Sequence, residues 1–157
     1  MTYDIMFLRV LPGRTFDEAL AEFNSAYDRE AGLRPMTVTG VERGVWDRLV
    51  QRISREVGPV TTEKYPYSLT LWRDGSAGHL QLDYSGDSAG IETPYRYPGR
   101  HALPIMAEAY RIARMVEEES GLEGYDYEVD QPVRTGDVDA AAARLGGVAR
   151  WAQENLA

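Results

Sequence analysis

The sequence predicts an α+β fold: a single antiparallel sheet of about four to six strands, with helices packed mainly against one face. Three observations point to this fold. Apolar residues recur with a period of two in the middle of the chain and with a period near 3.6 on either side of it. Short turns separate the central strands, which is typical of antiparallel pairing. Helices grouped before and after a run of strands are typical of α+β proteins rather than of alternating βαβ units.

The N-terminal part of the chain predicts a strand and then a helix. Residues 3–10 alternate with both faces largely apolar, so we expect an interior strand covered on two sides. Thr15 and Glu18 have the spacing of a capping box, which marks the start of a helix. We expect this helix to end near Gly32. Its apolar stripe follows at steps of four, three and four residues: Phe16, Leu20, Phe23 and Tyr27.

The central part predicts a second helix followed by a strand meander. The helix is expected over 43–57, with its apolar stripe between Val45 and Val57, and Gly58-Pro59 ends it. Residues 67–72 and 79–84 alternate, and the glycines between them predict a hairpin. Residues 88–95 are expected to add a third strand, and 60–65 a short edge strand.

The C-terminal part predicts a helix, a strand and a final helix. The long helix is expected over 102–119, with Gly121 closing it. Residues 125–130 alternate strictly and predict a strand with an acidic outer face. Thr135 or Asp137 is expected to cap the last helix. That helix has a composition that suits docking on its own domain or on a second copy of the chain, so a homo-oligomer remains open.

Composition limits the classes of function. The chain of 157 residues is expected to form one α+β domain over 1–157. Its 17 basic and 25 acidic side chains give a net charge of −8, which argues against nucleic-acid and membrane-surface binding. The sequence has no cysteine, which excludes disulfides and thiolate chemistry. There is no apolar run of about 18 residues and no secretory leader, so we expect a soluble, cytoplasmic protein.

Candidate reactive groups do not converge in the sequence. His79 and Asp83 lie four residues apart on an expected strand, a separation of roughly 13 Å, which is too far to share a metal. The glycine-rich loops at 73–78 and 85–90 lack the lysine and the following helix of a phosphate-binding loop. We therefore expect no catalytic residue, no metal and no cofactor. A carboxylate-based hydrolase stays an alternative, because Asp74, Asp83 and Asp87 lie near the expected hairpin ends. Glu92 lies near an expected strand.

Acidic and aromatic side chains gather after the long helix. Its last turn carries three glutamates, where the helix dipole disfavours negative charge. A solvated face and cross-strand aromatic pairs would account for this composition. The sharper interpretation is a surface that binds a basic partner, such as a cationic toxin or nuclease domain. The candidate partner-binding residues are Glu117, Glu118, Glu119, Tyr125, Asp126, Tyr127, Glu128 and Asp130.

Three segments resemble a group of short bacterial proteins. These are residues 3–7, residues 91–95 with Gly99 and Ala102, and residues 121–126. The group is mostly uncharacterised, and some of its members are thought to be immunity-like partners of secreted toxins. The resemblance spans roughly 125 residues and implies no catalytic residues.

The leading hypothesis is a non-enzymatic, immunity-like protein-binding module that occludes a basic partner. The alternative is a small-molecule-binding domain with a cleft between the sheet and the long helix. Tyr95, Tyr97 and His101 would then lie at the mouth of that cleft.

Overall fold

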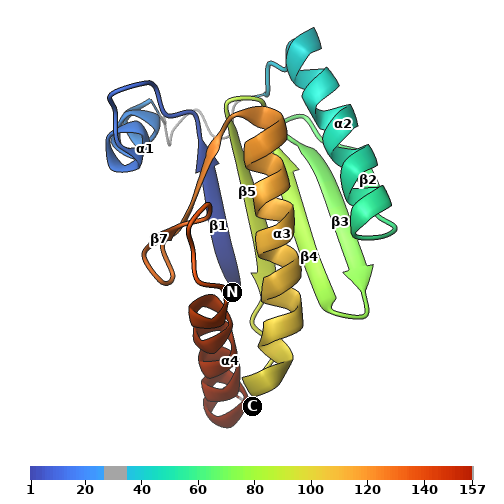
Figure 1. Ribbon diagram of the computed structural model, residues 1–157, viewed down its shortest axis with the longest axis vertical. Helices are drawn as coiled ribbons and strands as arrows, with labels where there is room; N and C mark the ends of the chain where they lie inside the picture. Colours follow the sequence, from blue (N-terminus) through green and yellow to red (C-terminus); the bar gives the residue numbers. More distant parts are fainter. Residues whose placement is uncertain (27–34, 157) are drawn as a thin grey trace.

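The computed structural model describes residues 1–26 and 35–156, and these form one sheet with helices on both of its sides (Figure 1). Every pair of neighbouring strands is antiparallel. The elements in chain order are β1 (Thr2–Leu8), α1 (Phe16–Ser25), α2 (Gly40–Glu56), β2 (Thr61–Lys64), β3 (Leu69–Gly75), β4 (Gly78–Tyr84), β5 (Ser88–Pro94), a 3₁₀ turn (Gly99–His101), α3 (Ala102–Ser120), β6 (Glu123–Asp126), β7 (Gln131–Pro132) and α4 (Val138–Asn155).

The predicted α+β class and the single antiparallel sheet are confirmed. The sheet has seven strands in the order β2-β3-β4-β5-β1-β6-β7, one more than the upper limit expected. The additional strand is β7, which has two residues and pairs with β6. Two residues, one of them a proline, are too few to produce a period-two pattern, so the sequence gives no sign of this strand.

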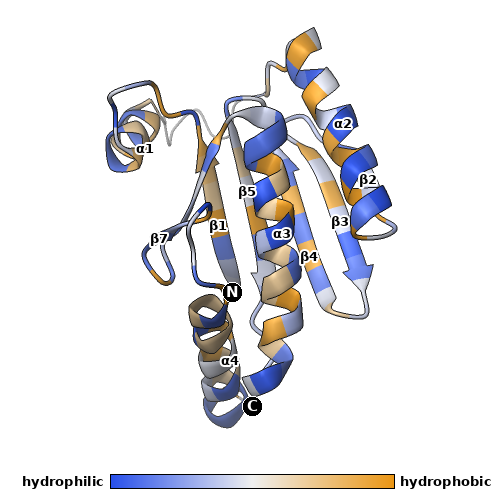
Figure 2. Ribbon diagram, viewed as in Figure 1, coloured by the Kyte–Doolittle hydropathy of each residue, from blue (hydrophilic) through white to orange (hydrophobic). Residues whose placement is uncertain are grey.

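Helices α2 and α3 cover one face of the sheet, and α4 packs beside the start of α3 (Figure 1). Figure 2 shows the apolar stripes of α2 and α3 and the alternation along β4. Trp46 of α2 stacks on Tyr84 of β4 with ring centroids 6.0 Å apart. The core under α3 is built from strand residues that point to this face, such as Ile5, Leu82 and Ile91. Burial of these side chains contributes the main favourable term for folding.

Helix α1 lies on the other side of the sheet. Phe16 at its start stacks on Tyr125 of β6, with ring centroids 5.4 Å apart. Tyr125 is in register with Met6, whereas its neighbour Gly124 is in register with Phe7 of the core. Tyr125 therefore points away from α3, and α1 packs on that side. The prediction that this helix ends near Gly32 is wrong, because α1 ends at Ser25 and Ala26 is its C-cap. Tyr27, expected on its apolar stripe, lies outside the described residues.

The predicted helix boundaries are largely confirmed by their caps. Thr15 accepts the backbone N–H of Glu18 at 3.1 Å, and Glu18 accepts that of Thr15, as a capping box requires. Asp137, rather than Thr135, caps α4. Gly121 ends α3 with a left-handed φ of 73°.

Two expectations about strands are wrong. The strand expected over 3–10 ends at Leu8, and it is not covered on both sides, because Asp4 is exposed. The strand expected over 125–130 ends at Asp126, and residues 127–130 form a turn. Asp130 closes this turn with a φ of 53°. Asp126 points into the core, so a strand that continued to Asp130 would direct Glu128 and Asp130 to the same side.

Helix α4 docks on its own domain. Leu145 is fully buried, and Gly146 lies against the backbone of Gly99. Trp151 remains 55% exposed near the end of the helix. Among the described residues, no helix is both long and apolar enough to cross a lipid bilayer.

Candidate functional site

The three glutamates at the end of α3 face the arginines of α2. Arg52 Nη1 lies 2.7 Å from a carboxylate oxygen of Glu118 and 3.4 Å from one of Glu119. Arg48 also pairs with Glu119, at 3.5 Å. Glu117 instead accepts the backbone N–H of Gly124 at 3.0 Å, and partial burial raises the pKa of its carboxyl. Glu118 and Glu119, which were expected to bind a partner, are therefore paired with arginines of the same chain.

Asp126 is buried in the core and does not reach the surface. Its Oδ2 accepts the hydroxyl of Tyr3 at 2.5 Å and also that of Tyr110 on α3. Its Oδ1 accepts the backbone N–H of Glu128 at 3.0 Å. Desolvation raises the pKa of Asp126, although the hydrogen bonds from the two tyrosines oppose the shift. The expectation that Asp126 projects from an acidic outer face is therefore wrong.

Glu128 and Asp130 lie in the turn after β6, and each accepts a tyrosine hydroxyl. Tyr95 donates to Glu128 at 2.6 Å, and Arg144 of α4 lies 3.5 Å from the same carboxylate. Tyr125 donates to Asp130 at 2.5 Å. Tyr127 is 43% exposed and donates to Asp17 of α1. The predicted partner-binding residues are thus divided between the α2–α3 contact, the core and this turn, and they do not form one patch.

The face of the sheet opposite α3, which we call the open face, gathers acidic residues instead. Directly paired residues on neighbouring strands point to the same side of a sheet. One row of paired residues therefore defines the open face across all seven strands. The row runs Glu63, Thr70, Asp83, Gly90, Met6, Tyr125 and Pro132.

All the Asp, Glu, Lys and Arg residues that the strands place on the open face are acidic. The two basic residues within the strands, Lys64 and Arg73, are both in register with the side covered by α3. Carboxylates therefore predominate on this side, where His79 lies beside Asp74 and the N-terminal amino group acts on Glu92. The acidic residues of the open face are Asp4, Glu63, Asp74, Asp83, Glu92 and Glu123.

Asp4 and Glu92 lie at the centre of the open face, directly opposite each other on β1 and β5. Both are exposed. The pKa of Glu92 is raised, first by partial burial and then by the charges of Asp4 and Asp83. The N-terminal amino group opposes this shift. The acidic residues are therefore close enough to repel one another, and a cation placed between them would relieve that repulsion.

A chain of side-chain hydrogen bonds fixes the neighbouring part of the open face. Trp72 Nε1 donates to Gln81 Oε1 at 2.9 Å, and Gln81 Nε2 donates to Asp83 Oδ2 at 3.0 Å. Thr70 Oγ1 donates to Asp83 Oδ1 at 2.6 Å. Tyr65 lies edge-on to Trp72, with ring centroids 6.1 Å apart. The acidic centre thus has an ordered aromatic pair on one flank, and Tyr125 with Phe16 on the other.

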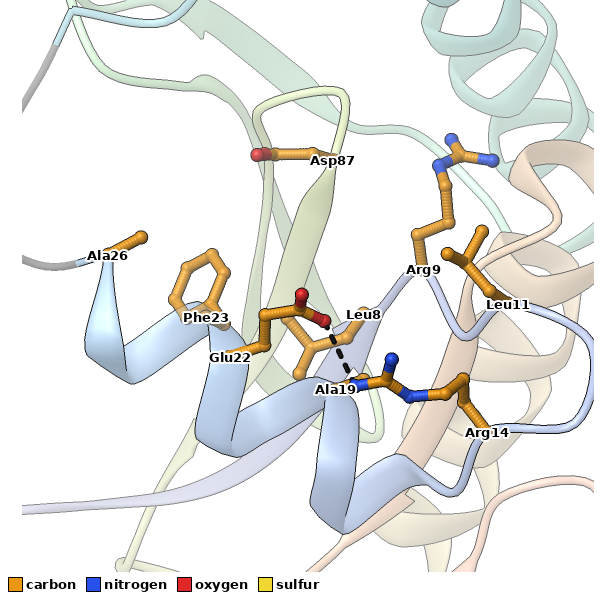
Figure 3. A pocket seen from close by; sticks show the side chains of 9 residues that line it. All are labelled: Leu8, Arg9, Leu11, Arg14, Ala19, Glu22, Phe23, Ala26 and Asp87. Carbon is orange, nitrogen blue, oxygen red and sulfur yellow. Dashed lines mark hydrogen bonds and ion pairs between the residues drawn. The ribbon is translucent and has the colours of Figure 1, made fainter.

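Two of the hollows among the described residues bear on the candidate sites. One, of about 320 Å³, forms where α1 packs near the end of β1 (Figure 3). Its lining mixes Leu8 and Phe23 with charged groups of both signs, and Arg14 pairs with Glu22 at 3.3 Å. The other, of about 460 Å³, is lined by Tyr97 and His101.

The candidate ligand-pocket residues are only partly brought together. Tyr97 and His101 line the same hollow. Tyr95 does not line it, because its ring packs beside Tyr3 and its hydroxyl bonds to Glu128. The other histidine, His79, lies 2.6 Å from Asp74 across the hairpin. Within residues 1–26 and 35–156, no group of three or more His, Asp or Glu side chains is arranged to hold a metal ion.

Sequence reasoning missed the open face, although part of its signal was present. Acidic residues alternate with apolar ones on the first strand and in the meander, and this pattern already places Asp4, Asp83 and Glu92 away from the core. Only the pairing register brings them together.

Comparison with protein-family models, curated proteins and solved structures found no match to this chain.

Proposed function

We propose that this chain is a non-enzymatic protein-binding module that docks a basic protein domain on the open face of its sheet. The observation that carries the proposal is the sign of that face: six carboxylates lie on it, and both basic residues of the strands lie on the other side. A surface of one sign favours partners of opposite charge and accelerates their encounter. A cationic toxin or nuclease domain, as the resemblance to immunity-like proteins implies, is a partner of this chemistry.

The order of the open face also supports the proposal. Trp72, Gln81 and Asp83 are held by hydrogen bonds before any partner arrives. A pre-ordered surface loses little side-chain entropy on binding. Half-buried Trp72 and Tyr125 would supply the apolar contacts that charged groups do not, since aromatic residues are enriched in the centres of interfaces.

Site-specific photo-cross-linking tests the location of the partner. A benzophenone side chain at Met6, which lies in the middle of the open face, is expected to capture a basic protein in the cells that produce this chain. The same group at exposed Arg111 on α3 serves as the control. The captured protein is then purified and its affinity measured with charge-neutral variants.

The deciding variant is Asp4→Asn combined with Glu92→Gln. Neither carboxylate has an ion pair within the described chain, so the change removes charge without breaking a salt bridge. We expect the dissociation constant to rise about tenfold, or about 1.4 kcal/mol. The matched control is Asp139→Asn with Glu154→Gln on α4, which changes the net charge equally at two other exposed sites. Equal affinities for the two double variants, or capture at Arg111 alone, would refute the proposal.

A further inference from the structure

The hollow beside Tyr97 has the composition of an anion-binding site. It lies where the β3–β4 turn, the loop after β5 and the start of α3 meet, at the end of the sheet where α3 begins (Figure 1). Its volume of about 460 Å³ falls within the range of roughly 300–1,000 Å³ that small-molecule pockets occupy. The lining includes Ser76, Arg96, Tyr97, Arg100, His101 and Pro104.

The walls of this hollow are held in place by contacts on both sides. The hydroxyl of Tyr97 accepts the backbone N–H of His79 at 2.7 Å. The Tyr97 ring lies so close to Gly78 that a Cβ there would stand 2.7 Å from it. Behind the loop, Gly99 packs on Gly146 of α4, where an added Cβ would stand 2.7 Å from the Gly99 carbonyl oxygen. The hollow is therefore formed by the fold itself rather than by loose side chains.

Three arginines lie at this hollow, and none of the residues that line it is acidic. Arg96, Arg100 and His101 line it, and the guanidinium of Arg150 lies beside Gly99 from the α4 side. In the part of the chain that the structure describes, these four side chains take part in no ion pair and no hydrogen bond. This is unusual in a chain of net charge −8, in which carboxylates outnumber basic groups.

We propose that the hollow binds a small molecule through an oxyanion, either a phosphate or a carboxylate. The two arginines, Arg96 and Arg100, would bind the oxyanion, because a guanidinium presents paired N–H donors that match two oxygens of either group. The ring of Tyr97 and the side chain of Pro104 would contact the body of the ligand. This site is separate from the open face, and it does not depend on the protein partner proposed above.

Titration with three probes tests this inference by NMR and calorimetry. Phenyl phosphate and benzoate carry the two oxyanions on the same ring, and phenol is the neutral control. We expect at least one of the two anions to bind with a dissociation constant below about 1 mM and to shift the signals of Gly78, Tyr97 and His101. Tighter binding of phenyl phosphate identifies a phosphate ligand, and tighter binding of benzoate identifies a carboxylate ligand. Equal binding of phenol would contradict the proposal.

Two variants assign the binding to the hollow. Arg96→Ala combined with Arg100→Ala is expected to weaken the anion at least tenfold, while the far-UV circular dichroism spectrum stays unchanged. Both side chains are exposed and make no ion pair within the described residues, so the fold does not depend on them. Arg111→Ala removes an exposed arginine of α3 outside the hollow and is expected to leave the affinity within twofold. Undiminished binding in the double variant, an equal loss in Arg111→Ala, or no binding of either anion at about 10 mM would each overturn the inference.

Discussion

The two adjacent glycines in α4 are expected to respond to alanine with opposite signs. Both lie inside α4, and replacing an interior glycine by alanine ordinarily stabilises a helix by about 1 kcal/mol. At Gly147 the added Cβ would meet nothing within 4 Å apart from neighbouring residues and backbone of its own helix, so the full gain is expected. At Gly146 the Cβ would stand 2.7 Å from the carbonyl oxygen and 3.0 Å from the backbone nitrogen of Gly99.

The cost at Gly146 exceeds the gain in helix propensity. Backbone atoms cannot rotate away as a flexible side chain can, so α4 or the loop at Gly99 must shift. Forcing an extra carbon into a packed site typically costs about 1–3 kcal/mol. After the helix gain of about 1 kcal/mol, we expect Gly146→Ala to lower the free energy of unfolding by about 1 kcal/mol. The two single variants should then differ by about 2 kcal/mol.

Urea unfolding followed by circular dichroism measures this difference. The midpoint is expected to rise for Gly147→Ala and fall for Gly146→Ala, with the same slope m in both, because neither change alters the surface exposed on unfolding. Thermal unfolding gives a second measurement, with a separation of about 4–8 °C for a chain of this length. If Gly146→Ala were as stable as Gly147→Ala, α4 would not pack on Gly99 as described.

Two further predictions concern the carboxylates. Asp126→Ala is expected to lower the free energy of unfolding by about 3 kcal/mol, because two tyrosine hydroxyls and a backbone N–H lose their acceptor in the core. Burial raises the pKa of Asp126, so its stabilising effect relative to alanine should be largest at acidic pH and should fall as the pH rises through that pKa. A difference in unfolding free energy between the unmodified chain and Asp126→Ala that grows with pH would contradict this. Asp4→Asn is expected to lower the pKa of Glu92, measured by NMR of the side-chain carboxyl carbon, whereas Asp139→Asn on α4 should leave it unchanged. A pKa of Glu92 that does not fall in Asp4→Asn would show that the two carboxylates do not interact.

Most of the fold follows from local sequence patterns. The hairpin of β3 and β4, the edge strand β2 and the caps at Thr15 and Gly121 each depend on residues close together in the chain. Periodicity and turn chemistry report such local choices directly. Helices α3 and α4 could therefore be placed closely from the sequence, whereas α1 ends at Ser25 rather than near Gly32 and α2 begins at Gly40 rather than at residue 43.

The segment after β6 could not be predicted because its conformation depends on distant residues. The residues from Tyr125 to Asp130 alternate as a strand would. Asp126 nevertheless lies in the core, where it accepts a hydrogen bond from Tyr3, 123 residues away along the chain. The hydroxyl of Tyr125 then closes the turn on Asp130. A period-two pattern does not distinguish an exposed carboxylate from one that meets two buried tyrosines, since that difference arises only in the folded core.

The candidate sites were predictable in chemistry but not in place. An acidic, aromatic surface was expected in the segment after α3. The acidic surface instead lies on the open face, where strand pairing places Asp4 beside Glu92 and Glu92 beside Gln81. Tyr97 and His101 were expected at a ligand pocket, and they do line one hollow. The arginines that give this hollow its charge are not distinguished in a sequence where arginine is common.

The association rate constant of the captured basic partner, measured from low to high salt, tests the central claim most directly. Electrostatic steering by the open face predicts a rate that falls steeply as salt rises. In Asp4→Asn/Glu92→Gln the rate at low salt should drop about tenfold and its salt dependence should flatten, while Asp139→Asn/Glu154→Gln should keep both close to the unmodified chain. A rate with the same value and the same salt dependence in all three proteins would contradict docking on the open face.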